Sequence, residues 1–329
     1  MTALEAPPVA TSAGLRVAGL RATARVRQGD VVLLDDVDLV VGEGRCTAVI
    51  GESGSGKSTL LRAILRTAGS NVRVSGEVSI GGVAVSSLGD REFAKVRGRD
   101  VALVAQNALA ALDPMFRVGG QIAYLARVHG GLTRDEADAR SLELLREVGI
   151  ADPERVAHSL PHELSGGMRQ RCVLAMAVAC NPRVLLADEP TTALDVITQA
   201  QALGLLRGIQ RERGMSMLFV THDIGVAATV ADDVVVLYAG RVVERGPVVD
   251  VLTAPSHPYT RGLVAANRPP APGERWAAIG GEPPRPGAAH TGCPFAARCA
   301  EAMPACATAP PLPIRLGLQT VSCYARGSG

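Results

Sequence analysis

The sequence has very little lysine and few aromatic residues. Lys57 and Lys95 are the only lysines among 34 Lys and Arg residues, and aromatic residues make up 3% of the chain. No basic run is long enough to indicate a nucleic-acid-binding surface, and the formal net charge is only +2. Composition and charge therefore indicate no nucleic-acid partner.

Long apolar runs are also missing. No run approaches the roughly 18 residues that a membrane-spanning helix needs, and residues 1–14 lack the basic and apolar regions of a signal peptide. We therefore expect a soluble, cytoplasmic protein unless another protein docks it to a membrane. Seven cysteines in a cytosolic chain argue against a disulfide framework.

A glycine-rich stretch fits the motif G-x-x-x-x-G-K-S/T between an apolar run and a helical pattern. This context predicts a phosphate-binding loop, in which backbone N–H groups and the next helix's dipole attract anions. We expect Lys57 to reach the β- and γ-phosphates and Ser58 to ligate Mg²⁺. A strand-to-helix turn that binds nothing is the alternative. The assigned loop residues are Gly51, Ser53, Gly54, Ser55, Gly56, Lys57, Ser58 and Thr59.

Short apolar strands alternate with helical patterns along the chain, which predicts an α/β fold. We expect a P-loop NTPase core of the RecA-like type with an N-terminal antiparallel β-subdomain, an inserted helical subdomain and a small Cys- and Pro-rich C-terminal extension. The expected divisions are a flexible tail (1–14), a nucleotide-binding domain (15–265, with core 15–106 and 181–265 and helical subdomain 107–180) and the extension (266–329).

The periodicity also predicts individual elements. Strands are expected at residues 31–34, 37–41, 76–85, 101–104, 184–187, 217–220 and 234–237. Helices are expected at residues 118–128, 133–148, 166–179 and 195–210, with Thr133 and Glu136 forming a cap. Residues 268–286 are rich in proline and read as a linker or irregular segment.

Two carboxylates follow a buried strand, where a parallel sheet places its ligand crevice. Asp188 is expected to hold Mg²⁺ and Glu189 to activate the attacking water as general base. His222 follows another strand and can contact the γ-phosphate. The alternatives are a capping role for the two acids and a purely structural histidine.

The stretch from Leu164 to Arg171 begins a helix with a serine and two glycines. Ser165, Gly166 and Gly167 expose N–H groups and a hydroxyl, which predicts a second anion site. The alternative is an ordinary helix start.

These motifs, in this order, together with Gln106, Asp195 and the Thr221-His222-Asp223 sequence, resemble the nucleotide-binding subunit of an ABC transporter. The resemblance covers about residues 15–265. It implies that ATP lies between two such domains arranged head to tail, with Ser165, Gly166 and Gly167 completing the partner's site. It also implies that Gln106 senses Mg²⁺ and the membrane domain, and that Asp195 acts across the dimer.

Further motifs resemble the ATPase subunits of peptide and nickel importers. They are Asp113-Pro114-Met115, the MRQR ending of the signature, residues 238–244 and His257-Pro258-Tyr259-Thr260. The MRQR ending resembles the first of two non-identical ATPases. The resemblance implies a sister ATPase, two membrane permeases, an extracytoplasmic solute-binding protein and a peripheral place on the cytoplasmic face of the membrane.

The expected cargo is an oligopeptide or dipeptide, and nickel, a metal chelate or a glutathione-like solute are the alternatives. An ABC ATPase outside transport, in DNA repair or translation, is the alternative of another class. A regulator that binds nucleotide without turnover is a third.

The chain departs from the family in having no aromatic residue before Phe93, although ABC ATPases usually stack the adenine on one. Either Arg25 or Arg27 replaces it, since guanidinium groups stack on π faces, or adenine lies on aliphatic side chains.

Four of the seven cysteines, Cys293, Cys299, Cys306 and Cys323, lie in the last 37 residues. A segment this short can hardly fold by burial alone. A 4Fe–4S cluster is the leading interpretation, because these spacings are wider than those of usual zinc sites, and zinc or free thiols remain alternatives. The stretch around Cys293 and Cys299 also resembles the C-terminal extension of peptide-transporter ATPases, some of which carry such a cluster. Cys46, Cys172 and Cys180 are expected to be packing residues.

Overall fold

The computed structural model describes residues 13–27, 29–106, 111–191, 195–270, 275–285, 287–288 and 290–327. The chain divides into two compact units, which are treated separately below. Of the described residues, those within 13–16, 40–45 and 79–218 belong to the first unit, and those within 17–39, 46–78 and 219–327 belong to the second. Residues 1–12 of the expected tail lie outside the described residues, whereas Ala13 and Gly14 already belong to a strand.

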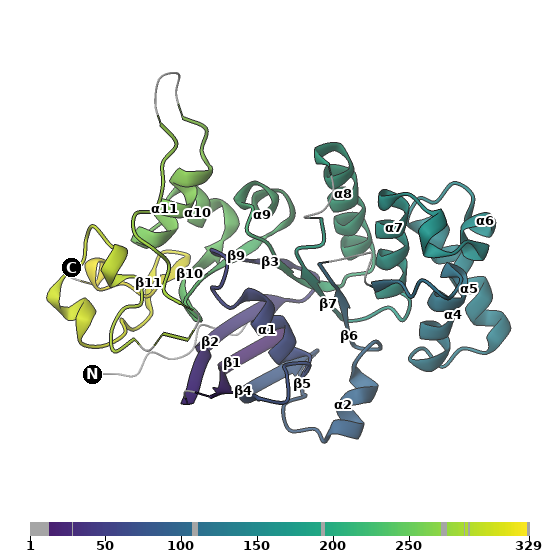
Figure 1. The fold of residues 1–329 in the computed structure, drawn as a ribbon, viewed down its shortest axis with the longest axis horizontal. Helices are drawn as coiled ribbons and strands as arrows, with labels where there is room; N and C mark the ends of the chain where they lie inside the picture. Colours follow the sequence, from purple (N-terminus) through teal and green to yellow (C-terminus); the bar gives the residue numbers. More distant parts are fainter. Residues whose placement is uncertain are drawn as a thin grey trace. The chain divides into compact units, whose positions relative to one another are not determined.

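The core of the second unit is a run of paired strands in the order β11-β12-β10-β9-β3. The central strands β3 (Cys46–Ile50) and β9 (Asp233–Tyr238) are parallel and apolar, as predicted for buried strands. Strand β10 (Arg241–Pro247) returns antiparallel to β9, and β12 (Gln319–Val321) and β11 (Ile314–Leu316) continue the sheet. The helices of this unit are α1 (Lys57–Ile64), α9 (Ile224–Val230), α10 (Val248–Thr253) and α11 (Pro258–Asn267) (Figure 1).

Strands β11 and β12 correct the expectation that the C-terminal extension has too little core to fold by burial. Val321 of β12 pairs with Glu244 of β10 and is fully buried, and Phe295 and Cys306 are also buried. The extension is therefore held by main-chain pairing with a sheet that begins about 270 residues earlier in the sequence, at Cys46.

A second sheet has the order β2-β1-β4-β5 and contains β1 (Ala13–Val26), β2 (Gly29–Gly42), β4 (Val72–Ile80) and β5 (Val83–Ala84). The two strands expected at 31–34 and 37–41 are one strand, because Asp35 between them is paired. Its N–H donates to the Gly240 carbonyl at 2.9 Å and its carboxylate forms an ion pair with Arg241. The single strand expected at 76–85 is a hairpin, because Gly81 and Gly82 adopt positive φ angles of 54° and 80°.

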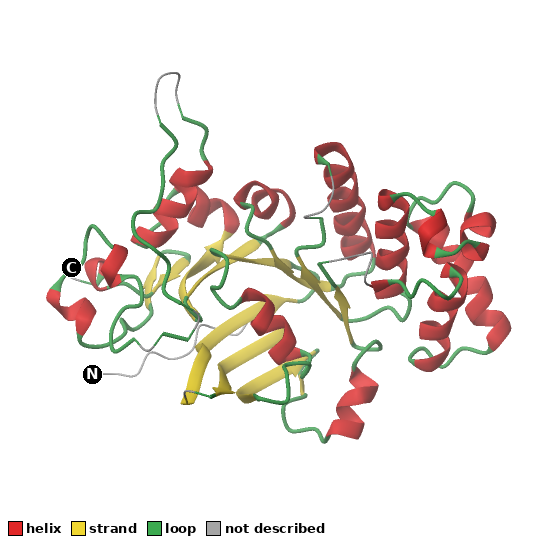
Figure 2. Cartoon of the chain, in the orientation of Figure 1, coloured by secondary structure: helices red, strands yellow, loops and turns green. Residues whose placement is uncertain are grey.

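The first unit contains a pair of parallel strands, β6 (Val101–Val104) and β7 (Val184–Asp188), and most of the helices. Helices α4 (Val118–Val128), α5 (Arg134–Glu147), α6 (Pro153–His158) and α7 (Gly166–Ala177) pack against one another, and α8 (Val196–Glu212) packs on α7. Figure 2 shows that this region is helical, as predicted. The Thr133–Glu136 capping box at the start of α5 is confirmed.

Two shorter elements and one shared strand complete the described chain. Helix α2 (Asp90–Val96), which the periodicity did not indicate, lies in the first unit. Strand β8 (Ser216–Val220) begins in the first unit and ends in the second. Within the described residues, no helix combines the length and apolar character needed to cross a lipid bilayer.

Candidate functional site

The phosphate loop connects β3 to α1 in the second unit. Ile50 at the end of β3 pairs with Val236 of β9, so Gly51 meets the Leu237 carbonyl. A Cβ atom built on Gly51, whose φ is 155°, would lie only 2.2 Å from that oxygen. Gly56 caps α1 with a φ of 107°, and a Cβ there would lie 2.9 Å from the Leu34 side chain. The loop therefore needs glycine at both ends.

Polar groups of this loop turn toward its interior. Lys57 is 7% exposed, and its Nζ donates to the carbonyls of Gly51 at 2.7 Å and Glu52 at 3.0 Å. The Ser55 hydroxyl is buried without a hydrogen-bond partner in the described structure. A buried hydroxyl without a partner is costly, and a phosphate oxygen would satisfy it. The loop thus has the shape and the donors of an anion site.

His222 belongs to the same unit. The Thr221 N–H donates to the Val49 carbonyl of β3 at 3.2 Å, which ties the segment after β8 to the strand that leads into the phosphate loop. Asp223 caps α9 by accepting from the Val226 N–H at 3.1 Å, and the His222 side chain is exposed. His222 therefore directly follows a residue, Thr221, that is hydrogen-bonded to β3.

The first unit brings Gln106 and Glu189 together from 83 residues apart. Asp188 is the last residue of β7, and Glu189 follows it with a positive φ of 45°. Gln106 Nε2 donates to Glu189 Oε2 at 3.1 Å. A non-glycine residue at such a φ carries backbone strain, which is characteristic of functional sites. The predicted general base is thus held by the predicted Q-loop residue.

The signature segment lies in the same unit. Ser165 caps α7 by accepting from the Met168 N–H at 3.3 Å, as predicted, and both Ser165 and Gly166 are exposed. A Cβ built on Gly167 would lie 3.4 Å from Thr198 of α8. Helix α7 therefore presents its first turn to the surface close to the start of α8.

Asp195 caps α8 through two hydrogen bonds with Thr198, at 3.0 Å to its N–H and 2.7 Å to its hydroxyl. These two bonds lower the pKa of Asp195, and the bond from the Thr198 backbone has the larger effect.

One contact near the signature was not predicted from the sequence. Gln170 of the signature donates to the Pro190 carbonyl, directly after Glu189. This hydrogen bond links α7 to the segment that carries Glu189, the predicted general base.

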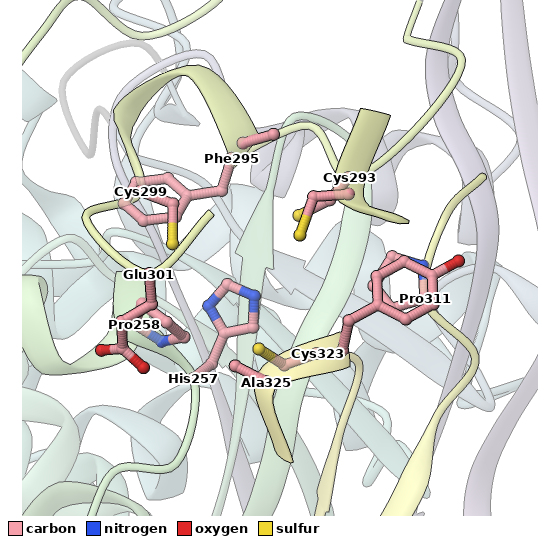
Figure 3. Close-up of a pocket in the computed structure, with 12 residues that line it drawn as sticks. His257, Pro258, Cys293, Phe295, Cys299, Glu301, Pro311, Cys323 and Ala325 are labelled. Atoms are coloured by element: carbon pink, nitrogen blue, oxygen red, sulfur yellow. The ribbon is translucent and has the colours of Figure 1, made fainter. Parts of the chain in front are cut away.

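The four C-terminal cysteines line one pocket, together with His257 and Phe295. Figure 3 shows the sulfurs of Cys293, Cys299 and Cys323 turned toward the space between them. Burial raises the pKa of Cys293 to about 11, and the neighbouring thiols add to the shift. Among the described His, Cys, Asp and Glu residues, however, no three form a group that could hold a metal ion.

His257 contributes a buried polar atom to this pocket. Its Nδ1 accepts from the Tyr259 N–H at 3.0 Å, so the ring proton belongs on Nε2, which is buried without a partner among the described residues. Burial lowers the pKa of His257 to about 3, so the ring is neutral. The lining of the pocket therefore includes a buried N–H donor that has no acceptor among the described residues.

The other three cysteines match their expected role. Cys46 and Cys172 are fully buried in apolar surroundings, and burial raises the pKa of Cys172 to about 12. Cys180 is half-buried and donates to the Leu125 carbonyl at 3.4 Å. These three are packing residues.

Comparisons with known proteins identify the family of this chain. The model of the ABC transporter family matches residues 34–192, and that of the oligopeptide/dipeptide transporter C-terminal region matches residues 243–306. The structure of the ATP-binding cassette MJ0796 as a dimer with ADP and Pi is 31% identical, with a TM-score of 0.63, and covers 71% of this chain and 98% of its own. CbiO1 of Clostridium perfringens has a TM-score of 0.64 at 26% identity and covers 74% of this chain and 92% of its own. The fold and the motifs are thus those of an ABC ATPase.

Relatives narrow the group further. A Brucella melitensis protein named for peptide import and ATP binding is 45% identical over 313 residues, which cover 91% of this chain and 93% of the relative. The oligopeptide transport ATP-binding protein OppD of Salmonella typhimurium is 39% identical over 312 residues, 94% of this chain and 93% of OppD. This chain belongs to the ABC transporter ATP-binding family, in the group that carries the oligopeptide/dipeptide C-terminal region.

Replacing Gly51 by alanine tests the phosphate loop. The new Cβ would meet the Leu237 carbonyl, so we expect ATP affinity to fall on the order of tenfold or more, with a loss of about 1–3 kcal/mol in the free energy of unfolding. Gly204→Ala in α8 is the control, because a Cβ there has nothing within 4 Å. Calorimetric ATP titration measures the difference, and equal affinity in Gly51→Ala and the unchanged protein would contradict this role of the loop.

Proposed function

We propose that this chain is the ATPase subunit of an importer of oligopeptides or dipeptides, coupled to two membrane permeases. The observation that carries the proposal is the order of the two family matches on one chain, an ABC ATPase followed by the oligopeptide/dipeptide C-terminal region. Relatives that span more than nine-tenths of this chain are named for peptide import or oligopeptide transport. ATP hydrolysis is the activity of the family to which the chain belongs.

ATP binding follows from the phosphate loop. The buried Ser55 hydroxyl, the start of α1 and the Lys57 ammonium favour the triphosphate. Mg²⁺ prefers oxygen ligands and neutralises phosphate charge. The Ser58 hydroxyl, the Asp188 carboxylate and the Gln106 side-chain oxygen fit that preference and are assigned to it. Because Gln106 Nε2 donates to Glu189, the amide oxygen is the atom left to act as a ligand.

Hydrolysis is assigned to Glu189, which takes a proton from the attacking water. The hydrogen bond from Gln106 fixes the direction of the Glu189 carboxylate, and the strained backbone at Glu189 fixes where the side chain begins. His222 contacts the γ-phosphate and keeps it in line with the water. Gln106 would thus contact both Mg²⁺ and Glu189. Proton removal by Glu189 would then depend on correct binding of the metal.

The complete site needs a second ATPase chain, for which we propose a sister subunit. Ser165, Gly166 and Gly167 start a helix at the surface, where their N–H groups can meet the nucleotide of another chain. Asp195 begins the neighbouring helix and acts across the same interface. The related cassette MJ0796 forms a dimer in its ADP- and Pi-bound structure, which supports this arrangement.

In this proposal the chain lies peripherally on the cytoplasmic face of the membrane. Closure of the ATPase pair on ATP drives the permeases, hydrolysis reopens it, and an extracytoplasmic solute-binding protein supplies the peptide. No nucleic acid takes part.

Glu189→Gln tests the assigned chemistry in the complex with the permeases and the sister ATPase. We expect vanadate-sensitive ATPase activity from this chain's site to fall by about a hundredfold or more, because the amide cannot accept the proton, while ATP binding remains. Glu154→Gln, on an exposed ion pair with Arg146, is the control and should keep full activity. Phosphate release and peptide uptake are the measurements. Undiminished turnover in Glu189→Gln would exclude Glu189 as the base.

We also propose that Cys293, Cys299, Cys306 and Cys323 hold a 4Fe–4S cluster. Four thiols around one pocket match the four cysteine ligands of such a cluster. Among the described residues no three form a group that could hold a single metal ion, so the proposal depends on the number of thiols around the pocket and not on their spacing. The unpartnered His257 Nε2–H faces this pocket and can donate to a sulfur. The cluster would cross-link the small extension.

Anaerobic purification tests this assignment. We expect absorbance at about 400 nm that is lost in Cys299→Ser and kept in Cys180→Ser, which lies outside the pocket. Iron and sulfide analysis should give four of each per chain. A colourless protein with one zinc per chain would show that the cysteines bind zinc and not a cluster. A metal-free protein would show that the four thiols are free, and it would also contradict the proposal.

A further inference from the structure

Arg298 of the C-terminal extension contacts the phosphate loop. Arg298 donates to both carboxylate oxygens of Glu52, at 2.6 Å from Nη1 and 3.0 Å from Nη2. Glu52 is the second residue of the loop, and the Arg298 side chain is only 4% exposed. The Glu52 side chain is 24% exposed, so the pair is largely buried. Two charge-assisted hydrogen bonds make such a pair stronger than an exposed surface ion pair.

The guanidinium of Arg298 is fixed on several sides. It lies 5.9 Å from the ring of Tyr238 and 5.8 Å from that of Phe295. It also donates to the carbonyl of Gly280 at 2.9 Å and to the Tyr238 hydroxyl at 3.3 Å. Its hydrogen bonds to Glu52 raise the pKa of Arg298 further above its ordinary value, so the group stays charged. Arg298 therefore acts as a rigid, permanent cation.

A second bond reaches the same loop residue from an aromatic cluster formed by Tyr238, Tyr259 and Phe295. The Tyr259 hydroxyl accepts the Glu52 N–H at 2.8 Å. Tyr259 packs on Tyr238 at 4.5 Å and on Phe295 at 5.4 Å between ring centroids. Phe295 and Arg298 both come from the extension, so the aromatic cluster and the arginine together hold Glu52 by its backbone and its side chain.

The ion pair with Arg298 compensates the negative charge of Glu52 in the phosphate loop. A loop that binds a triphosphate contains a carboxylate, which would repel the ligand if it were left uncompensated. Lys57 donates to the main-chain carbonyl of Glu52 at 3.0 Å. Among the described residues, Arg298 is a cation that donates two hydrogen bonds to the Glu52 carboxylate.

We infer that Arg298 is a positioning residue for ATP binding: it neutralises Glu52 and holds its carboxylate in place, so the C-terminal extension sets the affinity of the phosphate loop for ATP. The inference rests on the proposed function only in that the loop binds ATP. It does not depend on a metal in the cysteine pocket. The competing explanation is that the pair merely anchors the extension.

A charge-removal series in the full transporter complex separates the two explanations. In Arg298→Ala we expect the Kd and KM for ATP to rise on the order of tenfold, with kcat at saturating ATP nearly unchanged. Adding Glu52→Gln to Arg298→Ala should restore most of the affinity, because the repelling charge is gone. Arg298→Lys should lie between, since a lysine keeps the charge and loses the second hydrogen bond.

Arg261→Ala is the matched control, because it removes an ion pair with Glu301 of the same extension without touching the loop. Unchanged ATP affinity in Arg298→Ala, or no recovery in the double variant, would overturn the inference. If Arg298→Ala fails to fold, Glu52→Gln alone decides: affinity equal to or above that of the unchanged protein supports the inference, and affinity lowered tenfold contradicts it. Failure of the unchanged protein to bind ATP would instead contradict the proposed function.

Discussion

The account depends on one steric constraint, the absence of a side chain at Gly51. The parallel pairing of β3 with β9 brings the Leu237 carbonyl to the place where a Cβ of residue 51 would stand. With that space empty, the chain can turn after the strand, and α1 begins at Lys57. The Lys57 ammonium and the buried Ser55 hydroxyl belong to this turn, where they can donate to a bound anion. The register of two buried strands thus shapes the candidate site.

The C-terminal extension is part of this site rather than an appendage to it. Pairing of β12 with β10 and burial of Phe295 fix the extension on the sheet that carries the phosphate loop. Because the Glu52 carboxylate forms its ion pair with Arg298, 246 residues later, the last part of the sequence contributes to the electrostatic environment of the loop. Cys293 and Cys299, which line the cysteine pocket, lie within five residues of Arg298, the residue that binds Glu52.

Much of the fold could be predicted because local signals determine it. The glycine loop, the Ser165 and Thr133 caps and the apolar strands β6 to β9 each have a signature within a few residues. Contacts between distant residues have no such signature, and the pairs Arg298–Glu52 and Gln170–Pro190 were missed for that reason. Strands β11 and β12 were missed because their three-residue runs carry no clear alternation. The Asp35 pairing with Arg241 explains why acidic residues did not interrupt β2.

The central claim is that nucleotide joins the glycine loop of one chain to the Ser165 helix start of another. Light scattering of the Glu189→Gln chain with its sister ATPase measures this most directly, with and without ATP. The account predicts association in ATP, separation in ADP, and loss of ATP-driven association in Ser165→Tyr, which leaves the chain's own loop intact. A scattering mass that does not change when ATP is added would contradict the account. Association in ATP that is unaffected by Ser165→Tyr would contradict it as well.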